Sequence, residues 1–236
     1  MAIATHQGSR DTTSFTIRSL TKVDVQQTLE IEKEVFPNLF PPPSFRRELK
    51  NPKSHFLVAT RSVFTKRKSP IHEAEASQHG ILHHFLDAIR SRRSRAVPNP
   101  EHIVGFIGTW YMVDEAHIVS IGVRNEYQGR GIGDLLLLGA IDHAIETGAE
   151  TVTLEVRPSN LKARNLYKKH GLSERGVRKS YYSDDREDAI IMTSEPIQLP
   201  EFIRRHQSLK RLSLIHISEP TRPRLISYAV VCLKKK

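Results

Sequence analysis

The sequence predicts an α/β protein in which a central parallel strand pair lies between antiparallel strands of one mixed sheet, with about four helices around it. Three observations predict this class. The β-branched run Ile118–Val123 leads into the glycine-rich turn Gln128–Gly133 and then into a helical period over Gly131–Thr147. A further strand, Thr151–Arg157, follows that helix, and such a crossover makes the two strands parallel. Hairpin-like strand pairs flank this unit.

The N-terminal part of the chain predicts two strands and two helices around a proline-rich break. Four prolines in Pro37–Pro43 must end the preceding helix, because proline removes a backbone donor and restricts the residue before it. Ser44 is a suitable N-cap for the short helix that follows. The elements expected in order are a strand at Phe15–Leu20, a helix at Lys22–Phe36, a helix from Ser44 to Lys50 and a strand at His55–Arg61.

After residue 100 the chain reads as a hairpin, a crossover and a closing hairpin. Gly148 ends the crossover helix and Gly171 ends the next helix, since glycine readily takes the left-handed conformation found at helix ends. Ser159 or Asn160 caps that second helix. The strands expected are Ile103–Met112, Glu115–Arg124, Thr151–Arg157, Leu172–Tyr182 and Glu187–Glu195.

One globular domain, residues 15–197, is expected between a flexible N-terminus (1–14) and a C-terminal extension (198–211). Within it, residues 62–100 form a polar, basic insertion with a net charge of +4 (7 minus 3). A segment this long without clear structure is either functional or a solvated loop. We favour the solvated loop; the alternative is a basic arm that contacts RNA or an acidic protein surface.

Residues 212–236 are set aside as an artefactual tail, because Leu212–Arg222 resembles the translation of a sequencing-adapter end. This tail holds the only cysteine, Cys232, and a net charge of +4. The formal charge of +10 therefore becomes +6 (10 minus 4) for residues 1–211. Such moderate basicity suits an acidic partner or a phosphorylated cofactor without selecting either.

The composition also excludes several classes of protein. No apolar run approaches the ~20 residues of a membrane span, and the N-terminus lacks the apolar stretch of a secretory signal. Without cysteine before the tail, neither a disulfide nor a thiol nucleophile is expected, and a cytoplasmic location is the expectation. No metal-ligand spacing is present, so no metal is expected.

The glycine-rich turn Gln128–Gly133 is a candidate phosphate site. It opens a helix, where backbone N–H groups are free and the positive end of the helix dipole favours an anion. Glycine also lets a ligand approach the backbone closely. The alternative is an ordinary strand–helix turn.

Strand Thr151–Arg157 carries the second clue. Val152, Leu154 and Val156 point to one face, so Glu155 points to the other with polar neighbours. A central parallel strand is normally apolar on both faces, so this polar face indicates a cleft. Partial burial there is expected to raise the pKa of Glu155 and make it a general base. A salt bridge to a neighbouring arginine is an equally open alternative.

Two residues at the following helix each have one structural and one functional interpretation. Tyr167 lies in the apolar stripe and is either a core aromatic or a phenol that reaches the cleft and donates a proton. Asn160 is either a helix cap or a ligand contact, and the two roles are compatible.

Taken in order, these residues resemble the GNAT N-acetyltransferases. Val123–Gly133 is similar to the acyl-CoA-binding motif of that family, Arg/Gln-x-x-Gly-x-Gly/Ala. The resemblance covers about Phe15–Ile197 apart from the insertion, and departs from the family at Leu39-Phe40, where a tryptophan is commoner. The ribosomal-protein-alanine N-acetyltransferase branch is resembled by Leu154–Asn160, Leu166-Tyr167, Gly171, Arg178, Tyr181-Tyr182 and Arg186–Met192.

The resemblance implies a parallel strand pair splayed around an acyl-CoA cleft, with acetyl-CoA as a substrate and no metal. By motif position, Glu155 is the proton acceptor and Tyr167 the proton donor, and a backbone N–H at a strand kink near Val123 polarises the thioester carbonyl. The cofactor-binding residues implied are Ile121, Gly122, Val123, Gln128, Gly129, Arg130, Gly131, Ile132, Gly133, Asp134 and Asn160.

The acceptor implied is the N-terminal alanine of a ribosomal protein, with Arg178, Tyr181 and Tyr182 at the peptide entrance. Alternation along a strand would turn one of the two tyrosines toward the cleft or core and the other away. Other protein N-termini, lysines or a small amine are alternative acceptors. A non-enzymatic acyl-CoA-binding module and an RNA-binding module are the competing classes.

Overall fold

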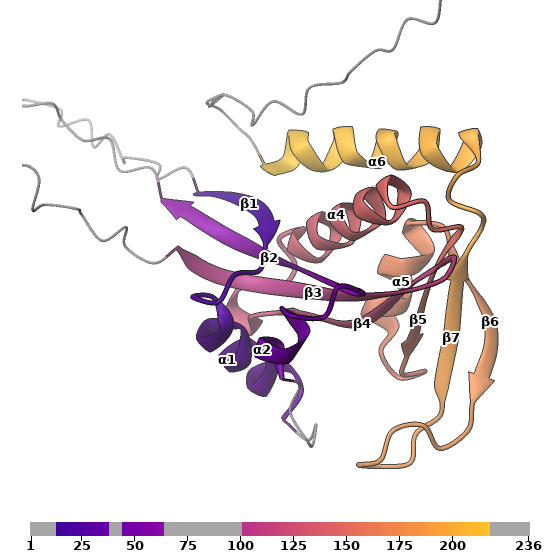
Figure 1. Cartoon of the computed structure of the whole chain (residues 1–236), viewed down its shortest axis with the longest axis horizontal. Coiled ribbons are helices and arrows are strands. Elements are labelled where there is room, and N and C mark those ends of the chain that lie inside the picture. Colours follow the sequence, from indigo (N-terminus) through magenta and orange to yellow (C-terminus); the bar gives the residue numbers. More distant parts are fainter. Residues whose placement is uncertain (1–12, 38–43, 64–100, 218–236) are drawn as a thin grey trace, which may run out of the picture.

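The computed structural model describes residues 13–37, 44–63 and 101–217, and these residues form one seven-stranded sheet with helices on both faces (Figure 1). The strands are β1 (Thr13–Ser19), β2 (Ser54–Val63), β3 (His102–Met112), β4 (Glu115–Val123), β5 (Thr151–Val156), β6 (Leu172–Arg178) and β7 (Ala189–Ser194). The helices are α1 (Val25–Val35), α2 (Phe45–Glu48), α4 (Ile132–Glu146), α5 (Leu161–Lys169) and α6 (Pro200–Ile217), with a 3₁₀ turn, η1, at Asn125–Tyr127.

The strand order β1-β2-β3-β4-β5-β7-β6 confirms the mixed sheet predicted from the sequence. Strands β4 and β5 are parallel, joined by the α4 crossover, and the other neighbouring pairs are antiparallel. The closing hairpin places β7 rather than β6 next to β5, which leaves β6 at the edge of the sheet.

The central pair separates part-way along its length. Parallel pairing of β4 with β5 runs from Glu115↔Thr151 to Ile118↔Leu154 and goes no further. At that point Val119 is an extra residue in β4, since Gly108 pairs with Ser120 while Thr109 pairs with Ile118. A bulge bends a strand and strengthens its twist, so the ends of β4 and β5 diverge where the predicted cleft residues lie.

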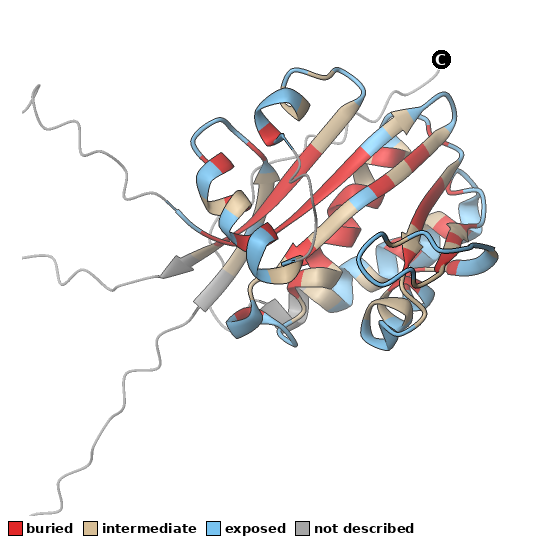
Figure 2. Cartoon of the chain, turned by 90° about the horizontal axis from the view of Figure 1, so that it is seen from below, coloured by how far each residue is buried: buried red, intermediate tan, exposed pale blue. Residues whose placement is uncertain are grey.

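Two apolar clusters hold the helices to opposite faces of the sheet. The larger one joins α4 and α5 to the sheet through residues such as Leu136, Leu154 and Tyr167. The smaller one packs α1 and α2 through Ile31 and Phe45. Figure 2 shows buried residues along the central strands and on the helix behind them. Cluster burial of this kind, rather than helix propensity, stabilises these helices.

Among the described residues, α6 is a fifth α-helix, where about four were expected for the whole chain. The extension predicted at 198–211 is helical, and the helix continues to Ile217, inside the segment set aside as a tail. It lies over α4, with Phe202 buried and His206 bonded to Asp142 (Figure 1). This second layer explains why α4 is buried on more than one side.

The predicted start of α1 and the predicted end of β6 were wrong, whereas Ser44 occupies the N-cap position predicted for α2. Helix α1 begins at Val25 rather than Lys22, because the Asp24 carboxylate accepts hydrogen bonds from both the backbone N–H and the hydroxyl of Thr21 and fixes a turn there. Ser44 precedes α2 but its side chain makes no capping hydrogen bond. Strand β6 ends at Arg178 rather than Tyr182, because residue 180 adopts a positive φ of 49°.

Several sequence predictions fall on residues outside the described ranges. These are most of the N-terminus, most of the Pro37–Pro43 loop, nearly all of the 62–100 insertion and the end of the tail. Within the described ranges, no helix combines the length and apolar character needed to cross a membrane, and no group of side chains is arranged to hold a metal ion.

Candidate active site

The glycine-rich turn forms a cradle of free backbone donors at the start of α4. Gly129 and Gly131 have φ of 76° and 78°, values that favour glycine. From Gly129 to Asp134, the backbone N–H groups donate no hydrogen bond to any described residue. Space is open around the position that a Cβ of Gly129 or Gly131 would take. A phosphate group can therefore approach these donors at the positive end of the helix dipole.

Other residues of the predicted motif stabilise this turn through side-chain hydrogen bonds and packing. The side-chain amide of Gln128 donates to the Val123 carbonyl at 3.2 Å and to Asn125 Oδ1 at 3.0 Å. A Cβ on Gly133 would lie 3.3 Å from Leu166, so this glycine allows α4 and α5 to approach each other. Ile132 is buried in the core. The motif thus combines exposed donors with close packing.

Arg130 and Asp134 have side-chain partners of their own. The Arg130 guanidinium lies 5.2 Å from the centroid of the Tyr127 ring. The Asp134 carboxylate accepts from Lys169 at 2.5 Å and lies 3.0 Å from His170 Nε2. The hydrogen bond from His170 contributes most to holding the pKa of Asp134 below its usual value. The Asp134 side chain therefore ties α4 to α5, and only its backbone N–H faces the cradle.

Beyond the bulge, the end of β4 is hydrogen-bonded on one side only. Ile121, Gly122 and Val123 pair with β3, and none of them pairs with β5. A Cβ on Gly122 would meet the Phe106 ring at 2.9 Å, which explains the glycine. The unpaired edge can bind an extended ligand in the manner of an added strand. The strand irregularity was predicted near Val123; it lies at Val119 instead, because the extra residue is accommodated where β3 changes register.

Glu155 lies just past the last residue of β5 that pairs with β4, on the face away from α4, and still pairs with Ile191 of β7. Its side chain is 6% exposed, with Oε2 2.9 Å from His117 Nε2 and Oε1 3.0 Å from Arg178 Nη2. The predicted rise in the pKa of Glu155 was wrong. The hydrogen bond from His117 holds the pKa of this carboxyl below its usual value and outweighs the opposing effect of burial. The arginine salt bridge considered as an alternative is present.

His117 was missed by the sequence analysis. It pairs with Thr153 across the parallel β4–β5 ladder, so both face the side that carries Glu155. Its Nδ1 also lies 3.5 Å from Glu115 Oε1. The alternation Glu115-Ala116-His117-Ile118 in the sequence was the available signal, since it places two polar side chains on the same face of the neighbouring strand.

Tyr181 and Tyr182 lie in the β6–β7 loop, so strand alternation does not apply and that prediction was wrong. Their rings are in edge-to-face contact, with centroids 5.2 Å apart. The Arg178 guanidinium lies 5.7 Å from the Tyr181 ring centroid. Burial raises the pKa of Tyr181, with a further contribution from the charge of Glu155. Arg178 and Tyr181 thus lie near Glu155, and their role in binding a peptide stays a prediction.

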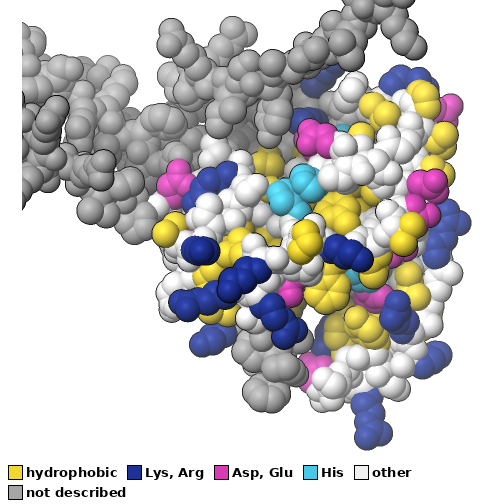
Figure 3. Space-filling view, viewed as in Figure 1, with side chains coloured by type: hydrophobic (Ala, Val, Ile, Leu, Met, Phe, Trp, Pro, Cys, Tyr) yellow, Lys and Arg dark blue, Asp and Glu magenta, His cyan; other side chains and the backbone are white. Residues whose placement is uncertain are grey.

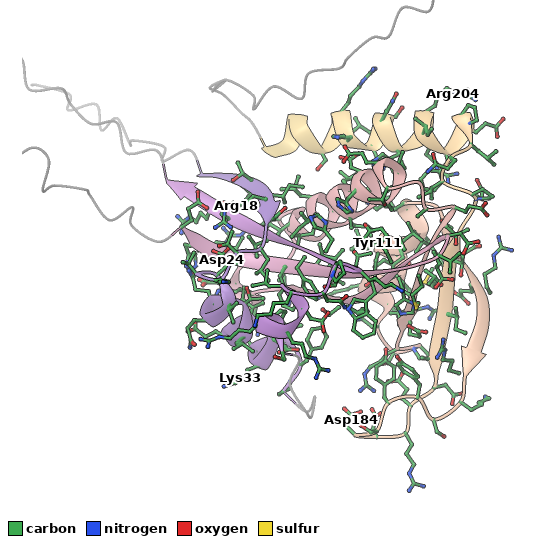
Figure 4. All side chains as sticks on the ribbon, viewed as in Figure 1. Arg18, Asp24, Lys33, Tyr111, Asp184 and Arg204 are labelled. Carbon is green, nitrogen blue, oxygen red and sulfur yellow. The ribbon has the colours of Figure 1, made fainter. Side chains whose placement is uncertain are left out.

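Arg157 fixes the loop that carries these tyrosines. Its guanidinium lies 3.7 Å from the Tyr182 ring centroid. It also bonds to three acidic side chains of the same loop: Asp184, Asp185 and Glu187. Figure 4 shows Asp184 at the tip of this loop, between β6 and β7. A bidentate, stacked arginine gives geometric specificity as well as energy.

Tyr167 lies on α5, which packs on the same face of the sheet as α4, and Asn160 directly precedes that helix. Tyr167 is 4% exposed and belongs to the larger apolar cluster, as its core reading predicted, and burial raises the pKa of its phenol. Within the described part of the chain, no hydrogen bond or ion pair joins Tyr167 to Glu155. Asn160 is the N-cap predicted for α5, and its Oδ1 accepts from the Ala163 N–H at 3.1 Å.

The approach to the cleft from α1 and α2 is basic. Figure 3 shows Lys and Arg side chains gathered over this part of the surface. The exposed basic residues here are Lys33, Arg46, Arg47 and Lys50. Near them, the half-exposed Trp110 donates to the Glu48 carboxylate at 2.9 Å. Trp110 pairs with His117 across the β3–β4 ladder and so faces the same side as Glu155.

Comparison with known proteins shows which protein family has this arrangement of strands, turn and side chains. The Acetyltransferase (GNAT) family model matches residues 61–172. The N-alpha-acetyltransferase RimI of Mycobacterium tuberculosis is 33% identical over 184 residues, which cover 77% of this chain and 93% of that protein. The ribosomal protein bS18-alanine N-acetyltransferase of Escherichia coli K12 is 42% identical over 92 residues, which cover 38% of this chain and 62% of that protein.

Solved structures agree with the sequence matches. The crystal structure of the ribosomal-protein-S18-alanine N-acetyltransferase from Escherichia coli superposes with a TM-score of 0.54 at 28% identity, covering 78% of this chain and 95% of that one. The region that the family model matches, residues 61–172, contains β4, the glycine-rich turn, β5 and Glu155. The chain belongs to the GNAT family and is an N-acetyltransferase.

Proposed function

We propose that this chain transfers the acetyl group of acetyl-CoA to the N-terminal α-amine of a protein, and that the acceptor is the N-terminal alanine of a ribosomal protein. GNAT enzymes use acetyl-CoA as their acetyl donor. Relatives named for acetylation of ribosomal protein bS18 at alanine support the acceptor. Such an acceptor would place the reaction in the cytoplasm.

The residues of the cradle fit acetyl-CoA. We infer that the backbone N–H groups from Gly129 to Asp134 hold the pyrophosphate, because free donors and open space coincide there; the Gln128 N–H, predicted to join them, donates to the Asn125 carbonyl at 3.3 Å instead. The unpaired edge of Ile121–Val123 would bind the pantetheine arm, whose amides can pair with a strand edge. Asn160 would contact the cofactor from the start of α5.

When bound, acetyl-CoA supplies an activated acetyl thioester. In the proposed reaction, Glu155 accepts a proton from the attacking amine and Tyr167 donates one to the leaving thiolate. The observation that carries this proposal is the position of Glu155, buried and ionised where β4 and β5 diverge. A carboxylate of lowered pKa is a weak base toward a free ammonium, but it can remove the acidic proton that the amine carries once it has attacked.

The entrance to the cleft suits a small first residue. Tyr181 stands close enough to Glu155 for that charge to raise its pKa, and Arg157 holds the loop in place through Tyr182. We infer that the Tyr181 ring beside Glu155 limits the size of the first side chain of the acceptor peptide. This arrangement supports alanine as the first residue of the acceptor. It also supports the α-amine at a chain end over the side-chain amine of a lysine within a peptide.

A peptide panel tests the acceptor. Peptides that differ only in their first residues are assayed by CoA release, together with N-blocked lysine peptides and simple polyamines. We expect the alanine-terminal peptide to have the highest kcat/KM. Equal rates for all three classes would reject the N-terminal alanine while leaving the enzyme an acetyltransferase. Mass spectrometry of ribosomal proteins after incubation with enzyme and acetyl-CoA then identifies the natural acceptor.

A further inference from the structure

The imidazole of His117 lies between two carboxylates. Its Nε2 is 2.9 Å from Glu155 Oε2 and its Nδ1 is 3.5 Å from Glu115 Oε1. Exposure falls along this row, from 37% for the Glu115 side chain to 16% for His117 and 6% for Glu155. A ring with both nitrogens directed at carboxylates has a fixed orientation and is stabilised in its doubly protonated form.

The row of Glu115, His117 and Glu155 is positioned entirely by strands β4 and β5. Glu115 pairs with Thr151 and His117 with Thr153 in the parallel ladder, and Glu155 is the next residue on that face of β5. Three positions on two neighbouring central strands therefore hold the three side chains. A site built on strands is more precisely placed than one built on loops.

The two oxygens of Glu155 have unlike partners. Arg178, which binds Oε1, is 54% exposed and lies at the end of the edge strand β6. His117, which binds Oε2, is largely buried between central strands. An incoming amine can displace an exposed guanidinium from one oxygen at small cost, whereas removing a buried partner leaves a charge unpaired.

We propose that His117 is a positioning residue for the proton acceptor: it holds Glu155 through Oε2, keeps it ionised, and leaves Oε1 to the acceptor amine. This inference rests on the proposed function. In the proton step, the N–H bond of the attacking amine breaks, its electron pair stays on nitrogen, and an O–H bond forms at Oε1. His117 gains and loses no atom in this step; it fixes where the carboxylate is.

The pH dependence follows from the groups that face this pair. Among the described residues they are Glu115 on β4, Arg178 on β6, and Tyr181 and Tyr182 in the β6–β7 loop. The neighbouring strands β3 and β7 contribute Trp110 and Thr193, which do not titrate in the working range. Glu155 must be ionised to accept a proton. Without the imidazolium, burial is opposed by Arg178 and a backbone hydrogen bond but no longer by its strongest opponent, so the pKa of Glu155 rises.

The first test is a double-mutant cycle with the alanine-terminal peptide. His117→Gln is expected to lower kcat about 10- to 100-fold, the scale of a misplaced catalytic group, with the acetyl-CoA-induced melting shift unchanged. The low-pH limb of kcat should move to higher pH, because the pKa of Glu155 rises without His117. In the Glu155→Gln background the same change should have no further effect, since the two residues act as one unit. Additive losses, or an unshifted pH profile, would overturn the proposal.

The second test does not depend on activity. The His117 imidazole is titrated by NMR in the wild type and in Glu155→Gln. Its pKa should be above the ordinary histidine value in the wild type and fall in the variant, because Glu155 is the main cause of the rise. An unchanged titration would overturn the pairing, whatever acceptor the enzyme uses.

His206→Gln is the matched control. His206, itself buried, pairs with the partly exposed Asp142 at 2.8 Å, between α6 and α4 and away from Glu155. It should leave kcat and its pH profile unchanged. Activity of the wild type on lysines or polyamines alone would reject the proposed acceptor without affecting the role of His117.

Discussion

The Arg157 guanidinium lies over the Tyr182 ring, 3.7 Å from its centroid, while its N–H groups bind three carboxylates of the same loop. One side chain at the end of β5 thereby fixes the β6–β7 loop next to the proposed proton acceptor. Since Tyr181 and Tyr182 form the proposed peptide entrance, the geometry of that entrance depends on a residue that belongs to the core strand.

Arg157→Lys should weaken peptide binding. Lysine keeps the charge but lacks the planar fork that stacks and binds two carboxylates at once. We expect KM for the peptide to rise about tenfold, corresponding to the loss of about 1–2 kcal/mol of stacking and hydrogen bonding. The acetyl-CoA-induced melting shift should stay the same. Arg18→Lys is the control, because Arg18 binds Asp24 and Glu101 far from the cleft (Figure 4); a rise in KM in both variants would refute a specific role.

Gly131→Asp should abolish binding of acetyl-CoA. A carboxylate placed in the open space of the cradle repels a phosphate, and the positive φ of residue 131 adds strain. Wild-type protein should melt at a higher temperature with acetyl-CoA, and this variant should show no shift. Gly148→Asp is matched to it, since Gly148 has φ of 79° and open space at the other end of α4. A retained shift in the first variant would place the phosphate elsewhere.

Tyr167→Phe should slow turnover without unfolding the protein. The ring packs in the core, so its loss would be costly, but phenylalanine preserves that packing. Loss of a general acid typically lowers kcat ~10²–10⁴-fold. Tyr111→Phe removes a hydroxyl that bonds to His143 near the far end of α4 and is the control. If both variants keep wild-type kcat, Tyr167 is a core residue only.

Glu32→Gln should stabilise the fold above neutral pH. Glu32 is 2% exposed, and neither of its oxygens has a hydrogen-bond partner among the described residues, so burial raises its pKa to about 7. A raised folded-state pKa means that stability is complete below the unfolded value and is lost as pH rises through about 7. At pH 8 the substitution should gain about 2–3 kcal/mol, and near pH 4.5 almost nothing. Equal gains at both pH values in chemical denaturation would contradict this.

Truncation after Arg211 should leave folding and acetyl transfer intact. The contacts that anchor α6 to α4 come from Phe202, His206 and Lys210, all of which remain. The measurement is the yield of folded protein and its kcat with the alanine-terminal peptide. Loss of folded protein would show that residues 212–236 contribute to the structure.

The sequence predicted the central architecture because its local signals agreed with one another. Strand alternation, the glycine turn and the helix ends at Gly148 and Gly171 all describe the same crossover. It failed where distant side chains decide the outcome. The start of α1 depends on contacts of Asp24, and the end of β6 depends on a loop held by Arg157.

The sequence by itself determined the crossover, the glycine-rich turn at the start of α4 and the face of β5 that carries Glu155, because periodicity and glycine conformation are properties of short segments. Only the tertiary structure decided the charge state of that carboxylate. Its pKa is lowered rather than raised because His117, 38 positions earlier in the chain, lies 2.9 Å away across the parallel ladder. Strand pairing brings such partners together, and no local pattern encodes the distance between them.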